Sequence, residues 1–196
     1  MSHFFAYLSR MRFIRRWGLM HNFYPENIQE HSLRVATIAH ALALIANEKF
    51  GGNFDADRAA AIALYHDASE VLTGDLPAPI KYHNEDIRDA YQSVEHKANE
   101  QLLRMLPEEL QTAFQPYLVK SDPGLQLLVK AADKLCAYLK ALEELRAGNQ
   151  EFADAARTLH AAVADIDRPE VQYFLETFAP SFELTLDQLN SDKTPR

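Results

Sequence analysis

The chain has 196 residues and a formal net charge of −8, so it fits one domain of ordinary size and lacks the clustered Lys and Arg of a broad nucleic-acid surface. No apolar run approaches the roughly 20 residues of a membrane-spanning helix, and the first residues lack the pattern of a signal peptide. Cys136 is the only cysteine, which excludes an internal disulfide and fits a reducing cytoplasm. We therefore expect a cytoplasmic protein with one domain over residues 1–190 and a loose polar tail over 191–196.

The first predicted elements are helices bounded by glycine. Apolar residues spaced by three and four predict a helix over 3–17, which Gly18 can end. The next helix is expected over 27–51. Asn27 is a favourable N-cap residue, and Glu30 three positions later completes a capping box.

A third helix is expected over 55–73, with Asp55 as its N-cap. The stretch 74–81 contains two prolines and predicts a rigid loop, because proline lacks an N–H and clashes inside a helix. The remaining helical segments are expected at 84–106, 108–117, 122–148, 151–165 and 169–178. Since the sequence contains no alternating strand, internal repeat or glycine-rich phosphate loop, we predict an all-α bundle.

Imidazole and carboxylate groups interrupt the apolar face of the third predicted helix. His66 and Asp67 follow the apolar run 59–64, and Glu70 comes four positions after His66. Residues three and four apart share a helix face, so these groups are expected on one surface. Burying an ionised carboxylate is costly unless a cation or strong hydrogen bonds compensate it. Taken alone, the His-Asp pair also fits a helix cap or a self-satisfied core pair.

Two further groups of this kind lie on other predicted helices. His31 is in the first turn of the second helix, and Asp133 interrupts the apolar face of the helix over 122–148. Lys130 and Lys134 could instead form a local ion pair with Asp133. Helical bundles build metal sites from side chains on facing helices. Two imidazoles and two carboxylates suit one divalent first-row ion with open positions for water and substrate.

The order His31, His66-Asp67, Asp133 resembles the H…HD…D signature of the HD-domain metal-dependent phosphohydrolases. Longer stretches resemble the bacterial HD-domain 5′-deoxynucleotidases, namely 30–33, 65–77, 134–140 and the segment Arg15-Arg16-Trp17. This resemblance covers nearly the whole chain. The segment 118–124 looks shorter than in that family, so no substrate contact is carried over to it.

The resemblance implies a homodimeric HD-domain helical bundle with a metal site in its core. It implies hydrolysis of 2′-deoxynucleoside 5′-monophosphates to deoxynucleoside and inorganic phosphate. One divalent ion, with cobalt favoured and manganese or copper as alternatives, would be held by His31, His66, Asp67 and Asp133. Neither a nucleic-acid polymer nor a membrane is expected as a partner.

The same resemblance assigns roles to four other side chains. Arg16 would meet the phosphate, and Trp17 would crowd the sugar 2′ position and exclude ribose. Glu70 would be essential for catalysis, and Asp75 would bind the 3′-hydroxyl or assist proton transfer. The residues themselves leave open which of Glu70 and Asp75 protonates the leaving oxygen. Little base preference is expected, because no second aromatic cluster or amide-rich segment suggests a base pocket.

Two other interpretations remain open from the sequence. One keeps the metal site and changes the substrate to a deoxynucleoside triphosphate, a cyclic nucleotide or an alarmone. Few basic positions are available to bind three phosphates. The other is a catalytically silent helical binding module, in which Asp67 and Asp133 only form buried ion pairs. A nucleotide panel and the metal content would distinguish them.

Overall fold

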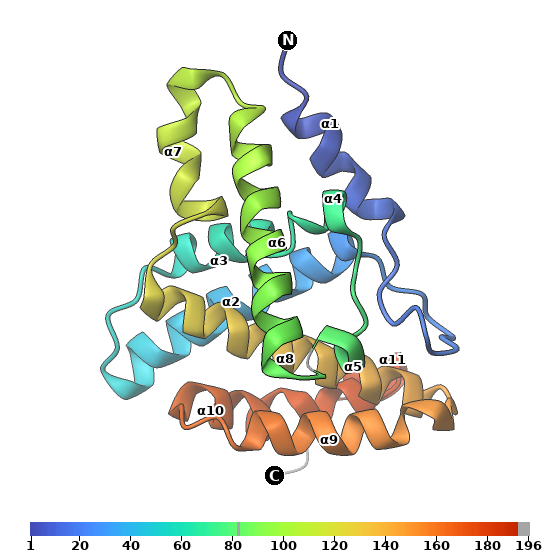
Figure 1. Cartoon of the computed structure of the whole chain (residues 1–196). Coiled ribbons are helices and arrows are strands. Elements are labelled where there is room, and N and C mark those ends of the chain that lie inside the picture. Colours follow the sequence, from blue (N-terminus) through green and yellow to red (C-terminus); the bar gives the residue numbers. More distant parts are fainter. Residues whose placement is uncertain (82, 192–196) are drawn as a thin grey trace.

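Helices α2 (Ile28–Phe50), α3 (Ala56–Tyr65) and α8 (Pro123–Arg146) pack against one another at the centre of the molecule. The computed structural model describes residues 1–81 and 83–191. Helices α9 (Ala153–Ala164) and α10 (Pro169–Thr177) cover α8 and α2 on one side (Figure 1). The facing sides of these helices share one apolar core, in which Leu42, Leu128 and Leu135 are fully buried.

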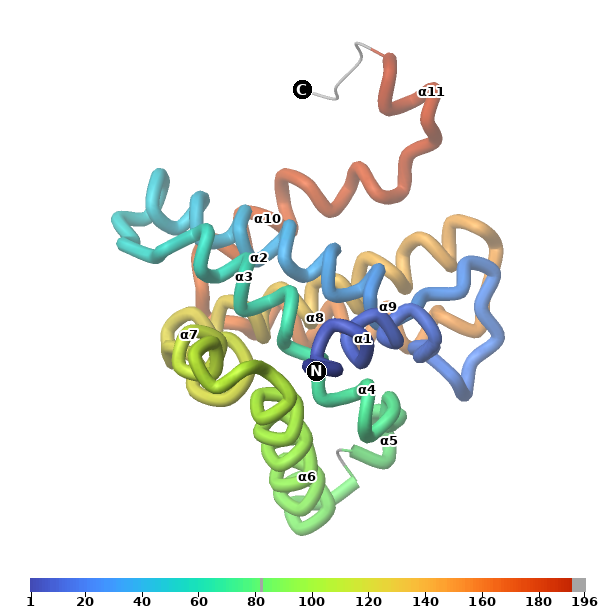
Figure 2. Tube along the Cα trace, turned by 90° about the horizontal axis from the view of Figure 1, so that it is seen from above, coloured from blue at the N-terminus to red at the C-terminus, as the bar shows by residue number. Residues whose placement is uncertain are grey.

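A helical hairpin projects from this centre. It consists of α6 (Glu85–Arg104) and α7 (Glu108–Leu118), and it lies away from the layer of α9 and α10 (Figures 1 and 2). Helix α1 (Phe4–Leu8) lies at the end of the molecule opposite α9. A second apolar cluster joins these parts through Phe4, Ala68, Leu102, Leu106 and Leu118. Because Ala68 follows the His66-Asp67 pair, this cluster anchors that pair.

The all-α class is confirmed for the described residues, where an isolated bridge between Arg15 and Asn27 is the only β-type pairing. The predicted capping box of α2 is present, since the Asn27 side chain accepts from the backbone of Glu30 and the Glu30 side chain accepts from Asn27. Asp55 and Asp122 likewise cap α3 and α8 through their side chains. Short polar residues at these positions satisfy backbone N–H groups that have no partner inside the helix.

The predicted helix over 3–17 is wrong in its second half. Helix α1 ends at Leu8, and a 3-10 turn, η1 (Ser9–Phe13), follows it. From Ile14 the chain is extended, because it pairs with the segment before α2: the Arg16 backbone N–H donates to the Glu26 carbonyl, and the Ile28 N–H donates to the Ile14 carbonyl. Arg16 and Trp17 therefore lie on a loop that reaches the centre of the molecule.

The predicted helix over 55–73 is interrupted where the polar residues begin. Helix α3 ends at Tyr65, and α4 (Glu70–Thr73) starts after a tight turn. In this turn the N–H groups of His66, Ala68 and Glu70 each donate to the carbonyl three residues earlier. The expectation that His66, Asp67 and Glu70 share one helix face is thus wrong, and the turn directs these side chains instead.

Four short elements were not predicted from the sequence: α5 (Ala78–Lys81), η2 (Gln150–Phe152), η3 (Ala179–Glu183) and α11 (Leu186–Leu189). The loop predicted over 74–81 is therefore wrong at 78–81, where Pro79 lies in the first turn of a helix, a position that tolerates proline. Most of the expected polar tail, residues 192–196, lies outside the described residues. None of the described helices combines the length and the hydropathy that a membrane span requires.

Candidate metal and phosphate site

Four side chains from separate parts of the sequence meet beside the core. His31 comes from the first turn of α2, His66 and Asp67 from the turn after α3, and Asp133 from α8. Nε2 of His31 lies 3.0 Å from Oδ1 of Asp133 and 3.6 Å from Oδ2 of Asp67. Ligand atoms of His31, His66 and Asp133 lie within 4.8 Å of one another. Atoms that bind one ion at about 2.1 Å stand about 3–4 Å apart, so this arrangement suits a single shared ion.

The orientation of His66 also fits a metal ligand. Its Nδ1 lies 2.7 Å from the Ala63 carbonyl, so Nδ1 carries the hydrogen and donates it. The other ring nitrogen, Nε2, then faces Asp67, whose Oδ2 is 3.1 Å away. Nε2 is buried and makes no hydrogen bond with any described residue. A cation at this point would satisfy that nitrogen and both carboxylates.

The electrostatics of the site favour positive charge between the carboxylates. Burial by itself lowers the pKa of His66, but the adjacent Asp67 carboxylate outweighs it and raises the pKa to about 9. Burial raises the pKa of Asp67, yet His66, His31 and Arg16 together hold that pKa well below its usual range. The pKa of Asp133 is also lowered, against its own burial, by the hydrogen bond from His31. Both carboxylates therefore stay ionised at neutral pH and are available to a divalent cation.

Arg16 lies against the same group. Its Nη1 is 3.4 Å from Oδ2 of Asp67, and its Nη2 is 4.0 Å from Oδ1 of Asp133. Burial opposes the charge of Arg16, but the neighbouring carboxylates, Asp133 first, raise its pKa above the usual value. The guanidinium is therefore permanently charged beside the candidate ligands. No described ion pair joins Asp133 to Lys130 or Lys134, so the local pairing considered above does not form.

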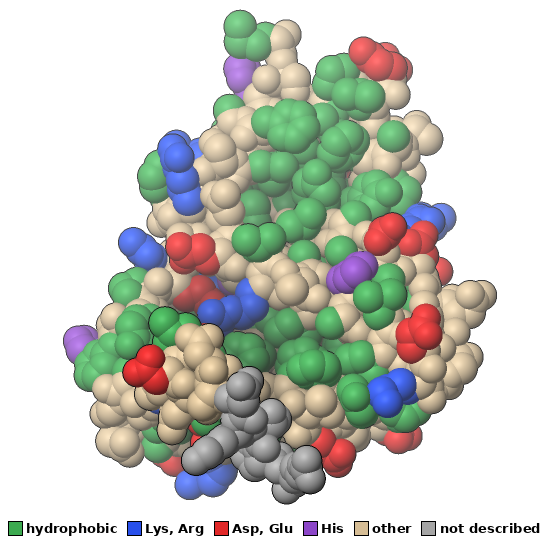
Figure 3. Space-filling view, turned by 180° about the vertical axis from the view of Figure 1, so that it is seen from behind, with side chains coloured by type: hydrophobic (Ala, Val, Ile, Leu, Met, Phe, Trp, Pro, Cys, Tyr) green, Lys and Arg blue, Asp and Glu red, His purple; other side chains and the backbone are tan. Residues whose placement is uncertain are grey.

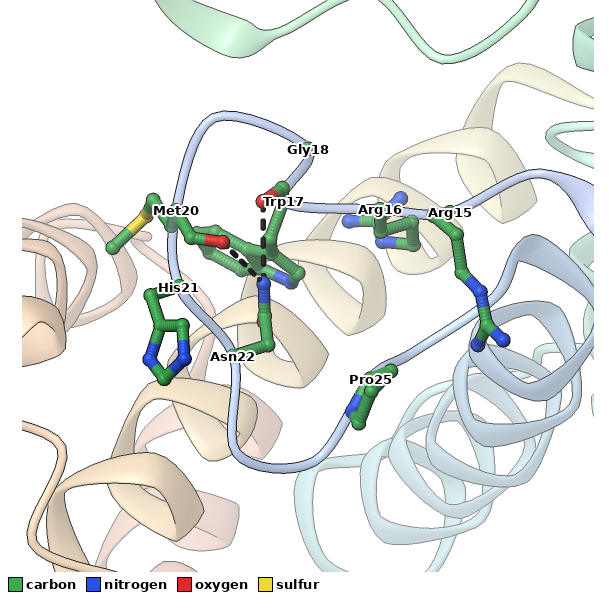
Figure 4. Close-up of a pocket in the computed structure, with 8 residues that line it drawn as sticks. All are labelled: Arg15, Arg16, Trp17, Gly18, Met20, His21, Asn22 and Pro25. Atoms are coloured by element: carbon green, nitrogen blue, oxygen red, sulfur yellow. Dashed lines mark hydrogen bonds between the residues drawn. The ribbon is translucent and has the colours of Figure 1, made fainter.

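Trp17 follows Arg16 in a left-handed backbone conformation, with a φ of 59° that non-glycine residues rarely adopt. Its ring packs on Phe152, with centroids 5.3 Å apart, and its Nε1 lies 3.3 Å from Oε2 of Glu26. Trp17 and Arg16 line a cavity of about 310 Å³ together with Met20, His21 and Asn22 (Figure 4).

Glu70 and Asp75 extend the site on the side of α4. Glu70 is only 5% exposed, and its Oε2 is buried without a described partner. Burial, with the charges of Asp67 and Asp75, raises the pKa of Glu70 to about 9. Burial also raises the pKa of Asp75, although Arg16 opposes the shift. These two carboxyls therefore hold a proton more readily than ordinary carboxyls.

Glu26 was not predicted as a site residue, yet it is only 7% exposed and contacts both Arg16 and Trp17. Its only sequence signal is its place directly before the N-cap Asn27, where an acidic residue is explained by the helix dipole alone. The contact with Arg16 depends on the backbone pairing of 14–16 with 26–28, which the helix predicted over 3–17 excludes.

Comparisons with solved structures identify the fold. An HD-domain phosphohydrolase from Listeria innocua superposes with a TM-score of 0.79 at 23% identity, covering 92% of this chain and 88% of that one. The cyanophage S-2L HD phosphohydrolase DatZ, solved with dA and one catalytic Zn²⁺ ion, gives a TM-score of 0.61 at 22% identity, covering 91% and 95%. The fold is therefore that of the HD-domain phosphohydrolases.

Comparisons of sequence narrow the class to one family. The model of the YfbR-like 5′-deoxynucleotidases matches residues 3–182. A 5′-deoxynucleotidase of Vibrio vulnificus is 54% identical over 191 residues, which are 96% of this chain and 98% of the relative. This chain belongs to the YfbR-like 5′-deoxynucleotidase family, which confirms the resemblance found in its sequence.

Proposed function

We propose that this protein hydrolyses 2′-deoxynucleoside 5′-monophosphates to the deoxynucleoside and inorganic phosphate. The observation that carries the proposal is the meeting of two imidazoles and two carboxylates beside the Arg16 guanidinium. Membership of the family supports the same reaction, since its relatives carry the name 5′-deoxynucleotidase. Little preference among the bases is expected.

His31, His66, Asp67 and Asp133 would hold one divalent metal ion. The buried, unpartnered Nε2 of His66 and the two ionised carboxylates fit such a cation. When bound, a divalent ion neutralises phosphate charge and lowers the pKa of a water molecule toward about 7. Cobalt is the favoured metal and manganese or copper are alternatives. The zinc ion of DatZ adds a fourth metal to test.

Arg16 and Trp17 would recognise the two parts of the substrate next to the reacting bond. A guanidinium matches the geometry of a phosphate and stays charged, so the Nη groups of Arg16 can bind two phosphate oxygens. Trp17, held beside Arg16, would form a wall at C2′ of the sugar. A ribose hydroxyl would meet that wall without a hydrogen-bond partner, which disfavours the ribonucleotide.

Glu70 and Asp75 would orient the attacking water and protonate the leaving group. In-line displacement at phosphorus needs positioning and charge neutralisation, and the leaving deoxynucleoside oxygen needs a proton. Glu70 would orient the attacking water. Either Glu70 or Asp75 could supply the proton, because the pKa of each is raised. Asp75 could instead bind the 3′-hydroxyl.

We further propose that residues 1–190 act as one HD domain in a cytoplasmic homodimer. Large apolar side chains are exposed on α1, η1, α2 and α3, among them Phe5, Phe13, Leu33 and Leu64. Figure 3 shows apolar side chains gathered over a broad part of one face. Contiguous apolar patches often mark interaction sites. Light scattering tests this point: twice the mass of one chain is expected, and the mass of a single chain would contradict it.

A substrate panel tests the reaction against its alternatives. Phosphate release would be measured from the four common deoxynucleoside monophosphates, and product formation from a deoxynucleoside triphosphate, a cyclic nucleotide and an alarmone. The proposal predicts activity on the monophosphates alone. Preferred turnover of any other member would redirect the assignment within the HD phosphohydrolases. A protein that turns over none of them and purifies without metal would be a silent binding module.

A further inference from the structure

We propose that Glu26 is a positioning residue that holds Arg16 and Trp17 in one arrangement beside His31. Phosphate binding and sugar selection would then depend on a single carboxylate oxygen. This inference rests on the roles proposed above for Arg16 and Trp17, and it adds a residue that contacts neither the phosphate nor the metal.

The contacts of Glu26 all point toward the site. Its Oε2 accepts from Nε of Arg16 at 3.2 Å and from Nε1 of Trp17 at 3.3 Å. The same oxygen lies 4.0 Å from Nδ1 of His31. Every described hydrogen bond of this side chain joins it to Arg16 or Trp17. A carboxylate that is 7% exposed is costly to bury, and here its compensation comes from the residues it would position.

The contact with Arg16 sets the direction of the guanidinium. The guanidinium is planar and rigid, so a partner on Nε fixes where both terminal nitrogens point. With Nε held by Glu26, Nη1 and Nη2 face Asp67 and Asp133. The terminal N–H groups are thus presented beside the candidate metal ligands, where a phosphate would need them.

The contact with Trp17 fixes an unfavourable backbone conformation. A φ of 59° at a large side chain persists only when surrounding contacts hold it. The indole N–H bonds to Glu26 on one side, and the ring packs on Phe152 on the other. Loss of the Glu26 charge weakens the bond from the indole N–H, since a neutral amide oxygen is a poorer acceptor, and so loosens one of these restraints on the ring.

Glu26 also lies near His31, on the side of Nδ1, the ring nitrogen that would not bind the metal. When Nε2 of a histidine binds a metal, Nδ1 must carry the hydrogen, and that N–H usually faces a carboxylate or carbonyl. Nδ1 of His31 is buried and has no hydrogen-bond partner among the described residues. Glu26 provides the negative charge on that side, so with a metal bound it would favour the tautomer that carries its hydrogen on Nδ1.

The first test compares Glu26→Gln with a matched control. Gln keeps the size of the side chain and removes its charge. We expect kcat/KM for dAMP to fall by ~10–100-fold, the usual cost of losing a carboxylate that orients a binding residue. The preference for dAMP over AMP should fall as well. Glu170→Gln is the control, because Glu170 is 3% exposed and pairs with Nε of Arg168 at 2.6 Å on α10, away from the site. That variant should leave both quantities unchanged.

A double-mutant cycle separates positioning from general damage. If Glu26 acts on the phosphate through Arg16, Glu26→Gln should add little to the loss of kcat in an Arg16→Ala background. Independent losses that multiply in the double variant would contradict the proposed route through Arg16.

The fluorescence of Trp17 gives a readout that does not depend on turnover, since it is the only tryptophan in the chain. In Glu26→Gln we expect a shifted emission maximum and stronger quenching by acrylamide, in metal-free protein as well, and no change in Glu170→Gln. If Glu26→Gln does not fold, Glu26→Asp replaces it. Asp keeps the charge but is one methylene shorter, so the Trp17 emission and the preference for dAMP over AMP should change in the same direction as in Glu26→Gln.

Unchanged emission with an unchanged dAMP preference overturns the inference. If wild-type protein does not hydrolyse dAMP, the proposed reaction fails, and the fluorescence alone decides whether Glu26 holds Trp17.

Discussion

Arg16 lies among the carboxylates of Glu26, Asp67 and Asp133, and its side chain is only 15% exposed. A guanidinium in such surroundings cannot lose its proton, so it offers a fixed charge to an anion. The carboxylates in turn hold it in one direction. At the scale of single residues, the site is therefore a buried set of opposite charges, at which we propose that one cation and one phosphate bind.

Trp17→Ala tests sugar selection. Removing the indole should preserve hydrolysis of dAMP and allow hydrolysis of AMP, because the wall proposed for C2′ is gone. The steric and desolvation penalty is roughly 1–3 kcal/mol, so the dAMP preference should fall by about 5–150-fold. The measurement is kcat/KM for dAMP and AMP. Tyr24→Ala, at an exposed aromatic residue of the same loop, serves as the control. A variant that still rejects AMP would remove Trp17 from sugar selection.

Glu70→Gln and Asp133→Asn should lose activity for different reasons. Glu70 is assigned to proton handling, so its variant should bind metal normally while kcat falls by ~10²–10⁴-fold. Asp133 is assigned to the metal, so its variant should lose the metal as well. Metal content after gel filtration, measured beside kcat, separates the two. Normal metal content in Asp133→Asn would exclude that residue as an essential ligand.

At the scale of elements, a buried ion pair on α8 anchors the loop that carries Trp17. Glu144 is fully buried, and it accepts from Lys140, from Nδ2 of Asn149 and from the backbone N–H groups of Phe23 and Tyr24. The Lys140 ammonium also donates to the Tyr24 carbonyl. The same helix supplies Asp133, so α8 carries both a candidate ligand and the anchor of the loop.

Glu144→Gln should destabilise the fold in a pH-dependent way. Burial alone raises the pKa of Glu144, but the hydrogen bonds from Lys140 and Asn149 outweigh it and lower the pKa to about 2. A lowered pKa in the folded state gives stability that is present above the ordinary pKa and is lost as pH falls through the lowered one. Breaking a buried pair costs roughly 3–5 kcal/mol.

Urea unfolding across a pH series measures this effect. The difference in unfolding free energy between wild type and Glu144→Gln should be large at pH 7 and should narrow between about pH 4.5 and about pH 2. The exposed pair Arg157 and Asp154 provides a control, and Asp154→Asn should change little. A difference that stays constant with pH would contradict the role of the Glu144 charge.

Local sequence signals predicted the helix starts correctly, but they did not predict the backbone that carries the site residues. The N-caps at Asn27, Asp55 and Asp122 bond to backbone N–H groups three residues later, so the sequence alone predicts them. The extended backbone at Ile14 and Arg15 depends on pairing with residues 26–28, which helical periodicity does not contain. In the turn at 66–69, Ala68 packs against Phe4 and Leu102, which are distant in the sequence. The four candidate ligands could be named from their motif, whereas Glu26 required the observed pairing of two segments.

At the scale of the whole molecule, the core does not depend on the site. The apolar cluster of α2, α3, α8 and α10 lies beside the candidate ligands and consists mainly of buried aliphatic side chains. Metal binding should therefore add to stability without being required for folding, unlike in small zinc domains whose fold is the metal site.

Removal of the metal should lower the unfolding temperature and leave a folded protein. A ligand that binds only the native state stabilises it by about 4 kcal/mol at a concentration 1,000 times its Kd. Circular dichroism during thermal unfolding, with chelator and with cobalt restored, measures the shift. The helical spectrum at 25 °C should be the same in both samples. Asp133→Asn should unfold at the same temperature with chelator and with cobalt. If cobalt raised the unfolding temperature of that variant as much as that of the wild type, the metal would bind elsewhere.

The most direct test of the central claim is phosphate release from dAMP and from AMP by chelated protein as cobalt is added back. We predict no release without metal, release from dAMP that saturates at one cobalt per chain, and little release from AMP. Release from dAMP that is independent of metal would contradict the four-ligand site. Equal release from both nucleotides would retain that site and contradict the selection of deoxyribose by Trp17.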